Sequence, residues 1–152
     1  LDVVKHVVKT LKQKENYDAD IITILQPTSP LRKSRTIDES IELLKSSQRY
    51  NSVLGVHLVK THPYASFNLK KGALKPFKNN FKKFYQRQTF PDLFFPTGSV
   101  YTFWRKTLEK YNSYLGPNIK PLIINDETII DVDDKFDLFL CEMILKHKQK
   151  IS

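Results

Sequence analysis

Four polar side chains follow a short apolar run near the start of the chain, in a segment stiffened by two prolines. Residues 26–32 are Gln-Pro-Thr-Ser-Pro-Leu-Arg. Gln26, Thr28 and Ser29 offer neutral hydrogen-bond donors and acceptors, and Arg32 offers a charged fork. A rigid loop of this kind can hold a polyhydroxylated ligand in one orientation. The same residues also suit a plain connection from a strand to a helix, so the loop alone leaves both interpretations open.

Two aspartates near the end of the chain, Asp131 and Asp133, are the second set of candidates. We expect them on an extended strand, where residues two apart point to the same face, so both carboxylates could act on one ligand. Alternatively, Asp133 or Asp134 caps the helix that is expected next. Both roles are compatible, because Asp134 is free to cap while the other two bind. No nucleophile lies in a pattern with histidine, so covalent catalysis is not indicated.

Hydrophobic periodicity predicts the elements that position these residues. We expect helices at 2–14, from Thr36 to about 46 with a capping box to Glu39, at 106–111 and from about 136, and strands at 18–25, 51–59, 99–104, 120–124 and 128–132. A hairpin is expected around Lys71-Gly72. This alternation predicts an α/β sheet with helices on its faces. Ligands of such sheets bind beyond the carboxyl ends of strands, which points to the loop after Leu25 and to the strand end at Ile130.

Composition indicates a soluble globular protein of one domain. The chain has 152 residues, a net charge of +9 and no apolar run long enough for a membrane span. Its single cysteine, Cys141, excludes an internal disulfide and favours a reducing, cytoplasmic compartment. The segment from Lys60 to Phe95 is rich in lysine and phenylalanine. It could bind an anionic ligand or nucleic acid, or it could be a solvated arm that packs its phenylalanines on a partner subunit.

Three blocks in this chain resemble the acylneuraminate cytidylyltransferases, the family of the CMP-sialic acid synthetases. The first is Leu-Gln-Pro-Thr-Ser-Pro-Leu-Arg at 25–32. The second is Gln-Arg-Gln at 86–88 with Pro-Thr-Gly-Ser-Val-Tyr at 96–101, similar to an Arg-Gln segment followed by Asn-Gly-(Ala/Ser)-x-Tyr. The third is Ile-Asp-Val-Asp at 130–133, similar to Ile-Asp-x-Asp. The resemblance spans nearly the whole chain. It implies the C-terminal part of a Rossmann-like sheet of the nucleotide-diphospho-sugar transferase type, without its N-terminal strands.

The resemblance also implies an activity. The family transfers CMP from CTP to the anomeric hydroxyl of a nonulosonic, sialic-type sugar acid and releases pyrophosphate, with Mg²⁺ as the main electrophile. Residues 60–95 fall where members build a dimerisation arm that lends basic residues to the neighbouring site. The implied partners are therefore the sugar acid, CTP and a second copy of the chain, with no membrane and no nucleic acid.

Individual site residues follow from the matched positions. Asp131 and Asp133 correspond to the metal ligands, and Arg87 to the arginine that reaches the substrate, so that Arg87 and Asp133 are the expected catalytic residues. The substrate-binding set is Gln26, Thr28, Ser29, Arg32, Tyr101 and Tyr114.

Some features depart from the family pattern. No glycine-rich phosphate loop is present, so we expect the nucleotide site to lie outside these residues and the 152-residue chain to be inactive alone. We also expect the missing N-terminal strands to leave an unpaired sheet edge that favours aggregation. Thr97 stands at the position where the family usually has asparagine, and Ala65 stands near the position where some members have lysine. Legionaminate and pseudaminate types are therefore open as acceptors. Three alternatives remain: a 3-deoxy-manno-octulosonate enzyme, which would carry Leu-Gln-Gly-Asp instead; a nucleic-acid-binding module; and a scaffold without activity.

Overall fold

The computed structural model describes the backbone at residues 1–77 and 90–151, and the side chains of these ranges up to residue 148. The chain divides into two compact units. The first comprises Leu1–His57 and Pro96–Ser152, and the second comprises Leu58–Phe95. The second unit nearly coincides with the basic and aromatic segment of the sequence.

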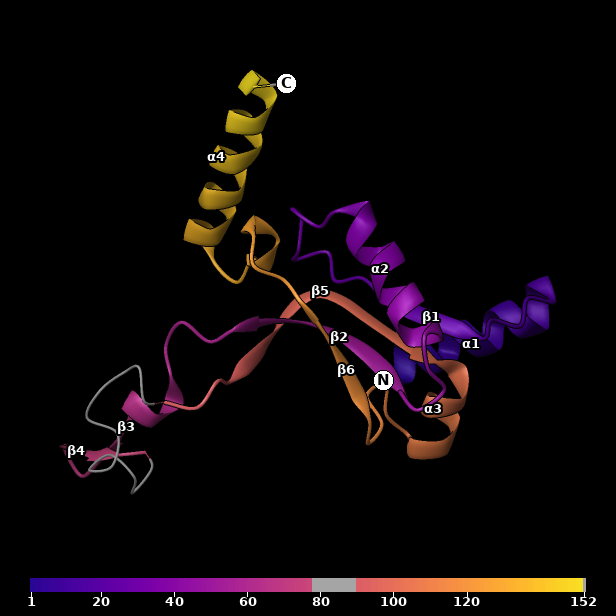
Figure 1. The fold of residues 1–152 in the computed structure, drawn as a ribbon, viewed down its shortest axis with the longest axis horizontal. Coiled ribbons are helices and arrows are strands. Elements are labelled where there is room, and N and C mark those ends of the chain that lie inside the picture. Colours follow the sequence, from indigo (N-terminus) through magenta and orange to yellow (C-terminus); the bar gives the residue numbers. More distant parts are fainter. Residues whose placement is uncertain (78–89, 152) are drawn as a thin grey trace. The chain divides into compact units, whose positions relative to one another are not determined.

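A four-stranded sheet forms the centre of the first unit (Figure 1). Its strands are β1 (Ile21–Ile24), β2 (Ser52–Leu58), β5 (Phe94–Trp104) and β6 (Ile119–Ile123), in the order β1-β5-β2-β6. Strands β1 and β5 are antiparallel, whereas β2 and β6 are parallel, so the sheet is mixed. The predicted α/β class is confirmed, and the sheet is compatible with part of a Rossmann-like nucleotidyltransferase.

Within the described ranges, four α-helices accompany the strands: α1 (Asp2–Glu15), α2 (Ser34–Lys45), α3 (Arg105–Tyr111) and α4 (Lys135–Ile151). Helices α1 and α3 each end at an asparagine in the left-handed conformation, Asn16 and Asn112, which is a common way to end a helix. Helix α2 contacts β6. Among the described residues, no helix combines the length and the apolar composition needed to cross a membrane.

The core of the first unit combines apolar side chains with a line of paired hydroxyls. Leu44, Val53, Val100 and Phe103 are fully buried. Beside them, the Thr102 hydroxyl lies 3.1 Å from that of Thr23 and 2.7 Å from that of Ser40. Because each buried hydroxyl has a partner, this line joins β1, β5 and α2 without leaving a buried polar group unsatisfied.

Two details of the predicted elements are wrong. Helix α2 begins at Ser34, its N-cap residue Lys33 makes no side-chain cap bond, and Thr36 is buried, so the expected Thr36 capping box does not form. The strand expected at 128–132 is also absent. Residues Glu127–Ile129 form a 3₁₀ turn, η4, because the Asp126 carboxylate accepts hydrogen bonds from the Thr128 amide (3.0 Å) and hydroxyl (2.6 Å). Asp131 and Asp133 therefore do not lie on a strand.

The predicted cap at the start of α4 is confirmed. The Asp134 carboxylate accepts from the backbone amides of Phe136 (2.7 Å) and Asp137 (3.0 Å). In return, the Asp137 carboxylate accepts from the amides of Asp133 (3.1 Å) and Asp134 (3.2 Å). This reciprocal pattern is a capping box made of two aspartates, and it fixes the entry of the chain into α4.

The second unit contains the predicted hairpin. Strands β3 (Phe67–Lys70) and β4 (Ala73–Pro76) are antiparallel, and Lys71 and Gly72 take positive φ angles of 50° and 77° in the turn between them. A short 3₁₀ turn, η1 (Pro63–Ala65), precedes the hairpin. The register pairs Phe67 with Pro76 and Leu69 with Leu74, so one face of the hairpin is apolar.

A cluster of charges beside η4 predicts a pH effect on stability. Lys33 Nζ lies 2.5 Å from Asp126 Oδ2, and hydrogen bonds from Lys33 and Thr128 lower the pKa of Asp126 from 3.8 to about 2. Because the folded-state pKa lies below the unfolded value, the ionised carboxylate stabilises the fold above pH 3.8. This contribution is lost as the pH falls from about 4 to about 2. In urea unfolding between pH 6 and pH 2, the free energy of unfolding should fall less with decreasing pH for Asp126→Asn than for the unchanged chain.

The exposed Asp38 on α2 provides the control for this measurement, since Asp38→Asn removes one carboxylate elsewhere on the same surface. If the free energy of unfolding changed equally with pH in the unchanged chain and in both variants, the pH-dependent stability would not come from Asp126.

Candidate functional site

The loop at 26–32 leaves β1 as two consecutive tight turns. The Ser29 amide donates to the Gln26 carbonyl and the Arg32 amide donates to the Ser29 carbonyl, each at 3.3 Å. The Val132 amide donates to the Thr28 carbonyl at 2.8 Å. This last bond places the segment around Asp131 beside the loop, although the two are about a hundred positions apart in the sequence.

Arg32 holds the loop to strand β5. Its Nε donates to the Ser99 carbonyl at 2.5 Å, and its Nη2 donates to the Gln26 carbonyl. Burial lowers the pKa of Arg32, while the nearby charge of Asp131 acts in the opposite direction. Two donors of the guanidinium are thus engaged by backbone carbonyls. The arginine expected to bind substrate is therefore well placed to position the loop.

Gly98 is the point where the loop and the aspartate segment meet. Its φ of +71° is a conformation that side-chain-bearing residues rarely adopt. A Cβ at this position would lie 2.7 Å from Gln26 Oε1 and 2.8 Å from Asp131 Oδ2. The Ser29 hydroxyl also donates to Asp131 Oδ1, at 3.4 Å. An amide oxygen and a hydroxyl from the 26–32 loop and a carboxylate from the segment around Asp131 thus lie close together at Gly98 of β5.

Two tyrosines lie at the side of this group. The rings of Tyr101, on β5, and Tyr114 meet edge to face, with centroids 5.5 Å apart. Burial raises the pKa of Tyr101, and the proximity of Tyr114 and the charge of Asp131 add to the shift. Tyr101 therefore keeps its proton at neutral pH and can donate or accept a hydrogen bond beside Asp131.

The structure brings most of the predicted site residues together. Gln26, Ser29, Arg32, Tyr101, Tyr114 and Asp131 are connected by the contacts above, and Thr28 contributes its backbone carbonyl. Asp133 is exposed, and its amide is bonded to Asp137 in the cap of α4. Arg87 lies outside the described residues.

Sequence reasoning missed the role of Gly98 and the use of the Ser99 carbonyl. The signal available for Gly98 was an isolated glycine directly before the strand predicted at 99–104, because such a glycine often marks a turn or a positive φ angle. Thr97, the departure from the family pattern, is 2% exposed and its hydroxyl lies 2.6 Å from that of Ser99. The Thr97 side chain is thus used inside the sheet, beside Gly55.

The residues around Gly98 suit a magnesium ion in their chemistry. Among the described residues, no group of three histidine, cysteine, aspartate or glutamate side chains could enclose a metal. Magnesium is usually held by only one or two carboxylates, with substrate phosphates and water completing its shell. Asp131, with the oxygens of Gln26 and Ser29 nearby, offers hard donors of this kind.

Comparison with known proteins supports the resemblance found in the motifs. No family model matches the chain. The chain is 29% identical over 143 aligned positions to the post-translational flagellin modification protein B of Campylobacter coli, which covers 91% of this chain and 59% of that protein. It is 27% identical over 154 positions to the CMP-N,N'-diacetyllegionaminic acid synthase of Legionella pneumophila, covering 98% and 65%.

A third relative is the N-acylneuraminate cytidylyltransferase of Escherichia coli O18:K1:H7, 25% identical over 158 positions, which cover 99% of this chain and 35% of that protein. The predicted resemblance to this group of proteins is confirmed along most of the chain. The chain itself spans less than two thirds of the length of each of the three.

Proposed function

We propose that this chain forms the sugar-acid side of a cytidylyltransferase, which transfers CMP from CTP to the anomeric hydroxyl of a nonulosonic acid. The observation that carries the proposal is the meeting of Gln26, Ser29 and Asp131 at Gly98. Gln26 and Ser29, Gly98, and Asp131 lie in three segments far apart in sequence, and each segment belongs to one of the blocks that resemble the family. The names of the relatives support the same reaction class.

The proposed reaction is a single displacement at phosphorus. The anomeric oxygen of the sugar acid forms a bond to the α-phosphorus of CTP, the bond from that phosphorus to the bridging oxygen of pyrophosphate breaks, and the hydroxyl proton passes to solvent. No covalent enzyme intermediate is required. The protein therefore acts by positioning the reactants and by stabilising charge.

Each residue of the site has a role suited to its chemistry. The side chains of Gln26, Thr28 and Ser29 offer hydrogen bonds to sugar hydroxyls, and Tyr101 and Tyr114 form a wall beside them. Arg32 holds the loop in place. We assign Arg87 to the sugar carboxylate or a phosphate, because a guanidinium can bind either in bidentate geometry.

Asp131 and Asp133 are the residues we assign to Mg²⁺. When bound, this ion supplies positive charge that offsets the charge of the triphosphate. Asp131 already lies beside oxygens of Gln26 and Ser29. The side chain of Asp133 is exposed, and we propose that its carboxylate is the second ligand.

The nucleotide side of the site is proposed to lie outside these 152 residues. The sequence has no glycine-rich phosphate loop, and the chain spans 59% and 65% of two relatives. We expect the 152-residue chain alone to form no CMP-sugar from CTP and a sugar acid, as followed by chromatography of the nucleotides. Detectable CMP-sugar from the purified chain would overturn this part of the proposal.

The acceptor is a nonulosonic acid whose exact type stays open among neuraminate, legionaminate and pseudaminate. One relative carries legionaminic acid in its name and another carries N-acylneuraminate. Because CTP and the reduced, buried Cys141 both fit a reducing compartment, we place the reaction in the cytoplasm.

A homodimer through the second unit is part of the proposal. Two leucines on the apolar face of the hairpin are exposed within one chain, Leu69 by 73% and Leu74 by 68%. An isolated two-stranded hairpin is marginally stable in water, so its apolar face is expected to be covered by a second copy. We predict that Leu74→Lys converts a dimer to a monomer in sedimentation equilibrium.

Ala73→Lys is the matched control, because Ala73 and Leu74 are neighbours whose side chains point to opposite faces of the hairpin. This variant should stay dimeric. A chain that is monomeric without any substitution, or a dimer unaffected by Leu74→Lys, would contradict the assignment of this face.

A further inference from the structure

A cavity of about 510 Å³ lies between helices α1 and α3 of the first unit, apart from the residues gathered at Gly98. Its lining comes from α1, from the loop that follows α1, and from α3 and its end: Lys5, Val8, Lys9, Lys12, Asp18, Arg105, Leu108, Glu109 and Asn112. A volume of this order matches sites for small organic molecules and greatly exceeds what one inorganic ion needs.

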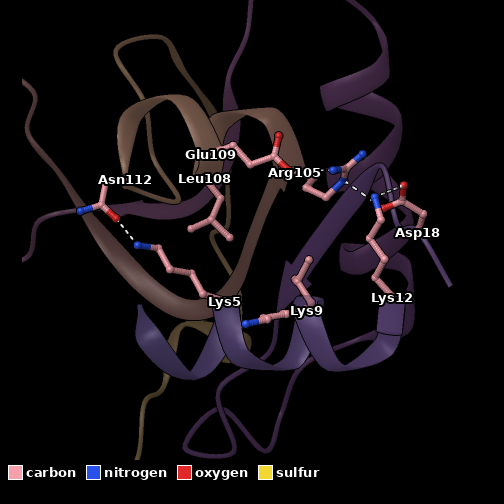
Figure 2. Close-up of a pocket in the computed structure, with 9 residues that line it drawn as sticks. Lys5, Lys9, Lys12, Asp18, Arg105, Leu108, Glu109 and Asn112 are labelled. Atoms are coloured by element: carbon pink, nitrogen blue, oxygen red, sulfur yellow. Dashed lines mark hydrogen bonds and ion pairs between the residues drawn. The ribbon is translucent and has the colours of Figure 1, made fainter. Parts of the chain in front are cut away.

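Side-chain bonds link α1, or the loop after it, to α3 and its end at two places along the cavity (Figure 2). At one end, Lys5 Nζ donates to the Asn112 side-chain oxygen. At the other end, Asp18 lies between two cations, 2.9 Å from Lys12 Nζ and 3.5 Å from Arg105 Nε. These bonds link α1, the loop after it and α3, and the middle of the cavity lies between them.

The middle of the cavity combines an apolar floor with uncompensated positive charge. Leu108, which is 4% exposed, and the half-buried Val8 contribute the apolar surface. Asp18 and Glu109 offset the charges of Lys12 and Arg105. The partner of Lys5 across the cavity is a neutral amide, and Lys9 has no hydrogen-bond or ion-pair partner among the described residues. Two positive charges one helical turn apart are thus left without a counter-charge.

We propose that this cavity binds a small phosphate monoester whose organic part is apolar. A phosphate monoester carries a charge close to −2 at neutral pH, which matches Lys5 and Lys9. Its oxygens accept hydrogen bonds from both ammonium groups, and its apolar part covers Leu108 and Val8. This second site does not rest on the proposed cytidylyl transfer, since none of its lining residues belongs to the candidate site.

The test uses phenyl phosphate as the probe and follows, by NMR, the ¹⁵N-labelled protein that contains this chain together with its nucleotide-binding segment. We expect saturable shifts of the backbone amides of α1 and α3. At physiological salt, Lys9→Glu should weaken binding at least tenfold. The milder variant Lys9→Gln should weaken it about threefold. Inorganic phosphate, which lacks the apolar part, and benzyl alcohol, which lacks the charge, should each bind at least tenfold more weakly than phenyl phosphate.

Lys14→Glu is the matched control. Lys14 lies on α1 at 180° from Lys5 when the helical rotation is about 100° per residue, and it does not line the cavity. The substitution changes the net charge by the same amount, so binding should stay within twofold. Equal weakening by Lys9→Glu and Lys14→Glu, shifts that do not saturate, shifts located away from α1 and α3, or equal binding of inorganic phosphate would each overturn the proposal.

Discussion

Replacing Gly98 with alanine is expected to lower kcat/KM for CMP-sugar formation by about 100-fold or more, equivalent to about 2.7 kcal/mol in the transition state. The added Cβ would lie 2.7 Å from Gln26 Oε1 and 2.8 Å from Asp131 Oδ2, closer than real Cβ contacts allow. One or both of these groups must then move away. The measurement is pyrophosphate release by the protein that contains this chain together with its nucleotide-binding segment.

Gly72→Ala separates this displacement from simple backbone strain. Gly72 has a φ of +77°, similar to the +71° of Gly98, but nothing lies within 4 Å of its Cβ position. Both variants pay the cost of a left-handed alanine, about 1 kcal/mol in unfolding free energy. Only Gly98→Ala should lose activity. If the two variants lost activity equally, the meeting of Gln26 and Asp131 at Gly98 would have no part in catalysis.

Asp131→Asn is expected to lower kcat by about 1,000-fold, or about 4 kcal/mol, while the fold is retained. Asparagine has nearly the same shape and can still accept from the Ser29 hydroxyl, so the packing around Gly98 should survive. What is lost is the negative charge beside Arg32 and the carboxylate that we assign to Mg²⁺. The expected signature is a fall in kcat together with a weaker dependence of the rate on Mg²⁺ concentration.

Asp134→Asn is the control for Asp131→Asn. Asparagine caps helices as well as aspartate does, so this variant removes a nearby charge and keeps the bonds to Phe136 and Asp137. Its rate should stay within a few-fold of the original. Asp133→Asn tests the second assigned ligand and should also lower kcat. A rate unchanged by Asp131→Asn would rule out the proposed role of its carboxylate.

The sequence predicted most elements because their patterns are local. The apolar run at 21–24, the periodic apolar face of α2 and the turn at Lys71-Gly72 each follow from neighbouring residues. The strand expected at 128–132 was wrong because a single side chain, Asp126, bonds Thr128 and turns the backbone before a strand can form. The pattern of apolar residues alone does not show whether a β-branched run forms a strand or is bent into a turn by a neighbouring side chain.

The sequence could predict which residues form the candidate site, but it could not predict how they contact one another. Motifs in two distant blocks pointed to Gln26, Ser29 and Asp131, and the structure gathers these residues. The sequence contained no indication that Arg32 would bond the carbonyls of Gln26 and Ser99. Such contacts depend on the placement of β5 next to β1, a pairing between segments that lie about eighty positions apart.

Pyrophosphate release from CTP tests the central claim most directly. The protein that contains this chain and its nucleotide-binding segment would be incubated with CTP, Mg²⁺ and, in separate reactions, N-acetylneuraminate, a legionaminate, a pseudaminate and 3-deoxy-manno-octulosonate. We predict release that depends on a nonulosonic acid, with one CMP-sugar formed for each pyrophosphate, and far slower release with the octulosonate. Release with none of the nonulosonic acids, or release only with the octulosonate, would contradict the account.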